Sequence, residues 1–165
     1  MLQVRFPLPL LAVLLLAAPA ATAQQSLTAT LTADIGVLGK ITVSALTLTF
    51  PDADPDAVPL VPAAGGPLTI VAKARSGLGS TVTLTVATPD DLRSGTDVIP
   101  ASALSWTATG PGFASGTLAS GVARTLGTWT GSGARTGTQT WFLANSWAYA
   151  SGMYSLTLTY TLTVP

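Results

Sequence analysis

The sequence predicts an all-β fold, an antiparallel β-sandwich of immunoglobulin-like or jelly-roll type with about eight strands. Three observations support this prediction. Apolar residues alternate with threonine at a period of two in several segments, turn-forming residues separate these segments, and no long segment has the apolar period of a helix. Because successive side chains of a strand point to opposite faces, each segment has one apolar face and one hydroxyl face. We therefore expect a threonine-rich domain with half-buried sheets.

The candidate strands follow one another along the chain. Residues 27–31 alternate leucine or alanine with threonine. In residues 41–50 the apolar parity changes between Ala45 and Leu46, which predicts a β-bulge or a strand that passes from one sheet to the other. The other candidates are residues 68–74, 82–86, 104–109, 113–118, 122–130 and 138–143.

The strongest alternation lies in residues 154–164. Six apolar side chains share one face, with serine or threonine at every position between them: Tyr154, Leu156, Leu158, Tyr160, Leu162 and Val164. A helix would scatter these side chains around its circumference, whereas a strand aligns them. The β-branched threonines also favour a strand. This pattern predicts a continuous half-buried strand at the C-terminal end.

Residues 1–23 have the layout of a cleavable secretory signal peptide. A basic start at Arg5 precedes an apolar run at residues 10–18, and small residues follow as far as Ala23. This run is too short for a membrane-spanning helix, which needs about 20 apolar residues. Cleavage after Ala23 would leave residues 24–165 as a single secreted domain. We expect no membrane span after cleavage and a location in the periplasm, at the cell surface or outside the cell.

The charge of the chain is low and nearly balanced. Seven basic and seven acidic residues make up 8% of it, and loss of Arg5 leaves six against seven, a net charge of −1. No basic field is available to hold nucleic acid, so we expect no nucleic-acid partner. A surface that depends on hydroxyl groups instead of charges associates readily with other proteins.

The residue types argue against catalysis. The sequence contains no histidine, cysteine or glutamate. Their absence excludes Ser-His-Asp triads, cysteine nucleophiles and ordinary zinc or copper sites. Lys40 and Lys73 are the only lysines, and neither lies in a recognisable serine–lysine signature. We expect a protein that is not an enzyme.

The densest acidic cluster consists of Asp52, Asp54 and Asp56. Alternating carboxylates can converge on Ca²⁺. An EF-hand loop, however, needs glycine at its sixth position and an acid at its twelfth, where this chain has Ala57 and Ala63. Two interpretations stay open: a calcium site completed by other loops, and a solvated, proline-stiffened loop whose aspartates form turns. The solvated loop is the favoured one.

All four tryptophans lie in the C-terminal half of the mature chain. Exposed aromatic rings stack on sugars, which makes Trp141, Trp147 and Tyr149 candidate carbohydrate-binding residues. The alternative is that the rings fill the core of the sandwich, as expected for tryptophans within strands such as Trp106 and Trp129. Core packing is the favoured interpretation.

Residues 154–162 resemble the terminal motif of the WxL bacterial cell-surface domains. The matching pattern is Tyr154, three residues, Leu158, Thr159, an aromatic residue, Thr161 and Leu162, with Tyr160 in the place of the motif's tryptophan. The resemblance implies an extracellular β domain. Such a domain associates non-covalently with the cell envelope or with partner surface proteins.

The leading hypothesis is a structural or adhesive protein, secreted or at the cell surface, that acts through protein contacts. Its partners would be cell-envelope or surface proteins, or further copies of itself. Strand addition at an uncovered sheet edge is a plausible contact, with residues 24–33 as the candidate added strand. The competing hypothesis is a carbohydrate-binding module that holds a polysaccharide on Trp141, Trp147 and Tyr149.

Overall fold

The computed structural model describes residues 29–165, so the predicted signal peptide, residues 1–23, lies outside the described residues. Contacts divide the chain into Met1–Asp34 and Ile35–Pro165. The described part of the first unit, residues 29–34, is exposed and has no regular secondary structure. The second unit contains eleven strands and one 3₁₀ helix, Ala101–Ala103, which confirms the all-β prediction. Within residues 29–165, no helix has the length and hydropathy needed to cross a membrane.

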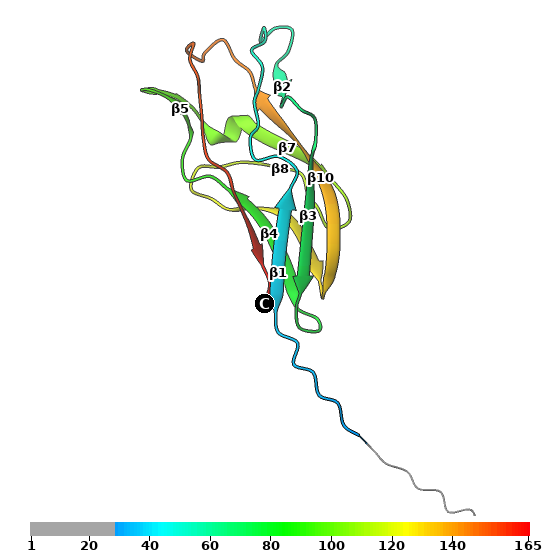
Figure 1. Ribbon diagram of the computed structural model, residues 1–165. Helices are drawn as coiled ribbons and strands as arrows, with labels where there is room; N and C mark the ends of the chain where they lie inside the picture. The colour runs from blue at the N-terminus through cyan, green and yellow to red at the C-terminus, as the bar shows by residue number, and fades with distance from the viewer. Residues whose placement is uncertain (1–28) are drawn as a thin grey trace, which may run out of the picture. The chain divides into compact units, whose positions relative to one another are not determined.

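The larger sheet has six strands (Figure 1). Their order is β1 (Leu38–Val43), β3 (Leu68–Arg75), β10 (Gly133–Ala144), β7 (Leu104–Thr109) and β8 (Gly116–Thr117), and β2 (Leu60–Pro62) also pairs with β10. Every pair is antiparallel. On one side, β10 pairs with β3 through residues 133–139 and then with β2 through residues 142–144. The 12-residue strand β10 is therefore the centre of this sheet.

The smaller sheet has three strands in the order β11 (Thr159–Thr163), β4 (Thr81–Ala87) and β9 (Arg124–Thr130). Its pairs are antiparallel, and the register of β4 and β9 shifts between Leu84 and Thr85. A separate hairpin is formed by β5 (Leu92–Ser94) and β6 (Asp97–Ile99). The two sheets form the layers of a β-sandwich, as the alternation predicted.

The core consists of the inward-facing residues of both sheets. Ile70 and Ala72 of β3, and all three inward apolar residues of β4, are completely buried. Trp106, Leu126 and Trp141 add side chains from β7, β9 and β10. Each fully buried aliphatic side chain contributes about 1.5–3 kcal/mol relative to an exposed one. The burial of alternate residues in β3 and β4 is the structural counterpart of their period-two pattern.

Two predicted strands are shorter than their alternation suggested. The C-terminal pattern begins at Tyr154, but β11 begins only at Thr159, because its neighbour β4 ends at Ala87, the residue paired with Thr159. β1 likewise ends at Val43, just before the change of parity, and residues 44–50 belong to no strand. The prediction of a bulge or a change of sheet at this point is therefore wrong: the parity changes just after the end of β1. Residues 29–31 are also outside any strand, and residues 27–28 are not among the described residues.

Candidate functional site

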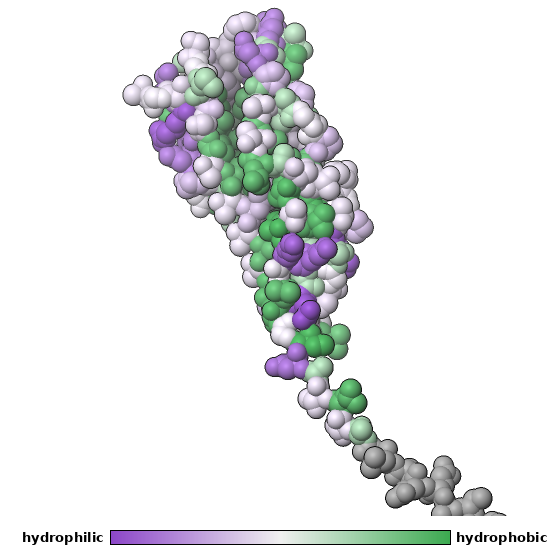
Figure 2. All heavy atoms as spheres, viewed as in Figure 1, coloured by the Kyte–Doolittle hydropathy of each residue, from purple (hydrophilic) through white to green (hydrophobic). Residues whose placement is uncertain are grey.

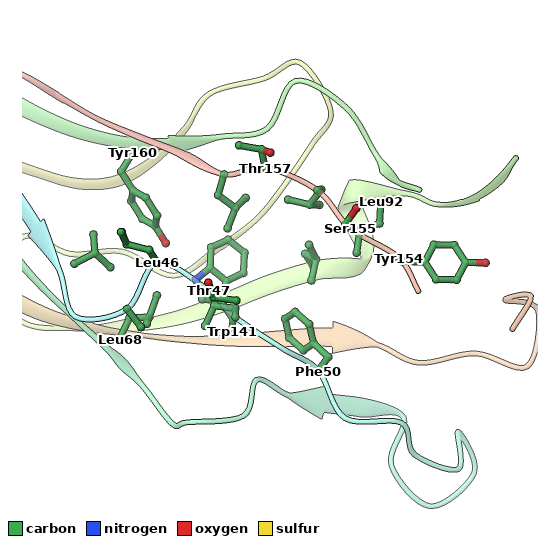
Figure 3. A pocket seen from close by; sticks show the side chains of 16 residues that line it. Leu46, Thr47, Phe50, Leu68, Leu92, Trp141, Tyr154, Ser155, Thr157 and Tyr160 are labelled. Carbon is green, nitrogen blue, oxygen red and sulfur yellow. The ribbon is translucent and has the colours of Figure 1, made fainter. Parts of the chain in front are cut away.

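An apolar groove of about 460 Å³ opens between residues 43–50 and residues 154–160 (Figure 3). Its floor is formed by core side chains from β3, β5, β7 and β10, namely Leu68, Leu92, Leu104 and Trp141. Its walls are the two chain segments that follow β1 and precede β11. None of the lining residues is charged. The groove is thus a stretch of sandwich core that neither sheet covers.

Both walls of the groove carry unpaired backbone. In the described part of the chain, no backbone–backbone hydrogen bond is formed by residues 45–48 or 156–158. Pairing resumes at the ends: Ser44 N donates to Thr69 O at 2.9 Å, and Ser155 exchanges two bonds of 3.1 Å with Arg93. Free N–H and C=O groups of this kind are a template for pairing with another strand.

The side chains of the walls continue the strand-like alternation. Leu156 and Leu158 are half-buried against the core, whereas Thr157 between them is exposed. On the opposite wall, Leu48 and Phe50 are half-buried in the same way. In Figure 3 the side chains of Phe50 and Tyr160 extend from the two walls, and Trp141 lies between these walls. Apart from Leu46, which is 96% exposed, the larger apolar side chains of the walls therefore face the groove, as those of paired strands would.

A buried polar group lies beneath the groove. The Tyr160 hydroxyl donates to Gln139 Oε1 at 2.7 Å. Burial raises the pKa of Tyr160 to about 12, and the neighbouring Trp141 indole offsets part of the rise. Nevertheless, Trp141 Nε1 and Gln139 Nε2 have no hydrogen-bond partner of good geometry among the described residues. An unpaired buried donor costs about 1–3 kcal/mol, so an acceptor for Trp141 Nε1 would stabilise the floor.

The groove ends where β1 and β11 come into contact. A Cβ atom on Gly39 would lie 2.9 Å from Cγ2 of Val164 and 3.5 Å from Cδ2 of Leu162, so these side chains pack directly on the glycine. Figure 2 shows a band of apolar side chains over the side of the sandwich that carries β1 and the C-terminal segment. The seam between the two sheets is closed at Gly39 and open along the groove.

The predicted sugar-binding aromatics do not form one surface. Trp141 is only 1% exposed and packs against Trp106, with ring centroids 5.2 Å apart, so the prediction that it binds sugar is wrong. Tyr149 is half-buried against the core. Trp147 is 71% exposed, and its Nε1 donates to Asp56 Oδ1 at 3.2 Å. Of the three candidates, Trp147 alone presents an open ring.

The aspartates of the predicted calcium site act as turn residues. Asp54 Oδ1 accepts from the Asp56 amide at 2.9 Å, and Asp54 O accepts from the amides of Ala57 and Val58. In the part of the chain that the structure describes, no three acidic side chains are grouped to hold a metal ion. The structure therefore does not bring Asp52, Asp54 and Asp56 together as a calcium site, because this loop is folded around turns and its carboxylates do not converge.

Comparisons with known protein families, with curated proteins and with solved structures find no match to this chain. The similarity of residues 154–162 to WxL domains therefore stays a prediction. The groove itself was not predicted from the sequence. Its signals were the parity change at Ala45–Leu46 and an alternation in residues 154–158 that continues where the partner strand has already ended.

Proposed function

We propose that this protein is a non-enzymatic structural or adhesive component, secreted or at the cell surface, that acts through protein contacts made by strand addition in the groove. The groove carries the proposal, because it combines an apolar, uncharged floor with unpaired backbone on both walls. An extended peptide bound there would gain affinity from main-chain hydrogen bonds and specificity from its alternate side chains. Cell-envelope proteins, surface proteins and further copies of this chain are the partners that fit such a contact.

The chemistry of the groove supports a binding role over a catalytic one. Its hydroxyl groups belong to Thr47, Tyr154, Ser155, Thr157 and Tyr160, and no charged side chain lines it. General acid–base catalysis needs a group that titrates near the working pH. The pKa of Tyr160, about 12, keeps this hydroxyl neutral under physiological conditions. Binding requires no such titrating group.

Amide hydrogen exchange on the exported chain tests the proposal. As the protein concentration rises, we expect assembly to protect the amides of residues 45–48 and 156–158, since these have no backbone partner in the isolated chain. Exchange at Ile70 and Leu84, in the middle of paired strands, serves as the internal reference. Assembly without protection of the groove amides would contradict the proposal, and a chain that stays monomeric at about millimolar concentration would exclude further copies of itself as the partner.

Carbohydrate binding is a second candidate, supported by the open ring of Trp147, which is 71% exposed. We expect retention on an insoluble polysaccharide to be lost in Trp147→Ala. Met153→Ala is the matched control, because Met153 is 93% exposed and also apolar. If the unchanged chain is not retained, or both variants behave alike, this candidate is wrong.

A further inference from the structure

We propose that the partner strand in the groove is supplied by a second copy of this chain, through its residues 27–37. This inference rests on the proposed function, because it names the occupant of the same groove. It is carried by three observations: the pattern of residues 27–37, the character of the groove, and the closed seam at Gly39.

Residues 27–37 have the alternating sequence pattern of a β-strand. Every odd position is apolar: Leu27, Ala29, Leu31, Ala33, Ile35 and Val37. The positions between them hold three threonines, Asp34 and Gly36. Over the described residues 29–37 the chain is exposed and in no strand, with Leu31 92%, Ile35 67% and Val37 59% exposed. Exposure of three large aliphatic side chains to water is unfavourable, and their burial in a groove would remove this free-energy cost.

The groove and this segment are complementary. The groove lining carries no charge, and residues 27–33 carry none either. The groove offers free backbone groups on two walls, and an added strand has N–H and C=O groups pointing to both sides. The apolar face of the added strand would cover the groove floor. Its threonines would lie on the solvent side, beside the exposed hydroxyls of Thr47 and Thr157.

The closed seam favours a second copy over the chain's own segment. Residue 37 joins the start of β1, whereas the groove lies beyond its end at Val43, about 20 Å further along a strand of this length. A strand returning to the groove directly along the seam from residue 37 would pass between β1 and β11. That path is occupied by Val164 and Leu162, which pack on Gly39. A segment from another molecule enters the groove without crossing this contact.

This contact is heterologous, because each copy uses its N-terminal segment on one neighbour and its groove on another. Heterologous contacts give rings if the rotation between copies closes, and open filaments if it does not. The proposal therefore predicts rings, filaments or a dimer closed by reciprocal exchange, in which every internal copy both donates a segment and accepts one.

The test uses the exported chain and a pair of aspartate substitutions on opposite faces of the segment. Leu31→Asp places a charge on the apolar face, and Thr30→Asp places the same charge on the hydroxyl face. By sedimentation, we expect Leu31→Asp to weaken assembly by at least about tenfold, since a buried leucine is lost. Thr30→Asp should assemble as the unchanged chain does. Equal effects of the two substitutions would overturn the proposal.

A mixing experiment identifies the groove as the acceptor. Ala45→Trp fills the groove from an exposed wall position and leaves the segment intact. Neither Leu31→Asp nor Ala45→Trp should assemble alone, but their mixture should form a dimer that grows no further. The double variant mixed with Leu31→Asp should stay monomeric. Circular dichroism and thermal melting confirm that each variant is folded, and both positions are exposed in the isolated chain.

The outcomes separate the two proposals. If Leu31→Asp assembles like the unchanged chain while the groove amides remain protected, the segment is not the occupant and another strand is, so only this inference fails. If Leu31→Asp lowers the melting temperature of the dilute monomer, the chain fills its own groove and this inference is again wrong. If the unchanged chain never assembles with itself, this inference fails, and the proposed function then depends on envelope or surface proteins as the partners of the groove.

Discussion

Replacing Trp141 by alanine is expected to lower the free energy of unfolding by about 3–5 kcal/mol, the range for truncating a large aromatic in a core. Trp141 is 1% exposed, packs on Trp106 and supports the groove floor. By contrast, Trp147→Ala should change stability by no more than about 0.5 kcal/mol, because that ring is 71% exposed. Urea denaturation followed by circular dichroism measures both.

These two tryptophans form a matched pair, since the substitution is the same and only the environment differs. Trp141→Phe provides a milder change if the alanine variant does not fold. Its loss of unfolding free energy should lie between the losses of Trp141→Ala and Trp147→Ala. Similar losses for Trp141→Ala and Trp147→Ala would show that Trp141 does not support the core.

Stability is expected to fall by about 2–3 kcal/mol between pH 10 and pH 12 because of Tyr160. In the unfolded chain its hydroxyl titrates at the ordinary pKa of 10.0, whereas burial raises the folded pKa to about 12. The folded state therefore holds its proton more tightly. Its contribution is complete below pH 10 and is lost as the pH rises through about 12. Unfolding free energies measured from pH 8 to 12 test this.

Tyr160→Phe should remove most of this alkaline decline. Part of the decline will remain in Tyr160→Phe, because desolvation and the charge of Asp97 also raise the pKa of Tyr154. Tyr160→Phe also leaves Gln139 Oε1 without its donor, so a lower stability near pH 7 is expected as well. An unchanged decline in Tyr160→Phe would mean that other groups cause it.

The long strands could be predicted because a period of two is a property of the strand itself. The candidate at residues 104–109 coincides with β7, and those at 68–74 and 82–86 lie within β3 and β4. Strands of two or three residues, such as β2 and β8, are too short to show a period. They account for much of the difference between about eight predicted strands and the eleven observed.

The groove could not be predicted because pairing depends on what lies beside a segment. Residues 154–158 have the same alternation as β11, yet their pairing with described strands is limited to one isolated bridge, between Ser155 and Arg93 of β5. Trp141 illustrates the same limit within one strand. The sequence places Trp141 and Phe142 on opposite faces of β10 without saying which face is covered, and only the packed sheets decide that Trp141 is inside.

The central position of β10 determines when this protein can fold. Ala74 and Leu68 of β3 pair with Gly133 and Gln139 of β10, although every strand from β4 to β9 lies between them in the sequence. Closing so large a loop precedes any gain from the contacts, which places such topologies among the slower folders, in milliseconds to seconds. A chain interrupted before residue 133 has β3 and β7 but not the strand that joins them. Assembly of the larger sheet is therefore a late event that requires nearly the whole polypeptide.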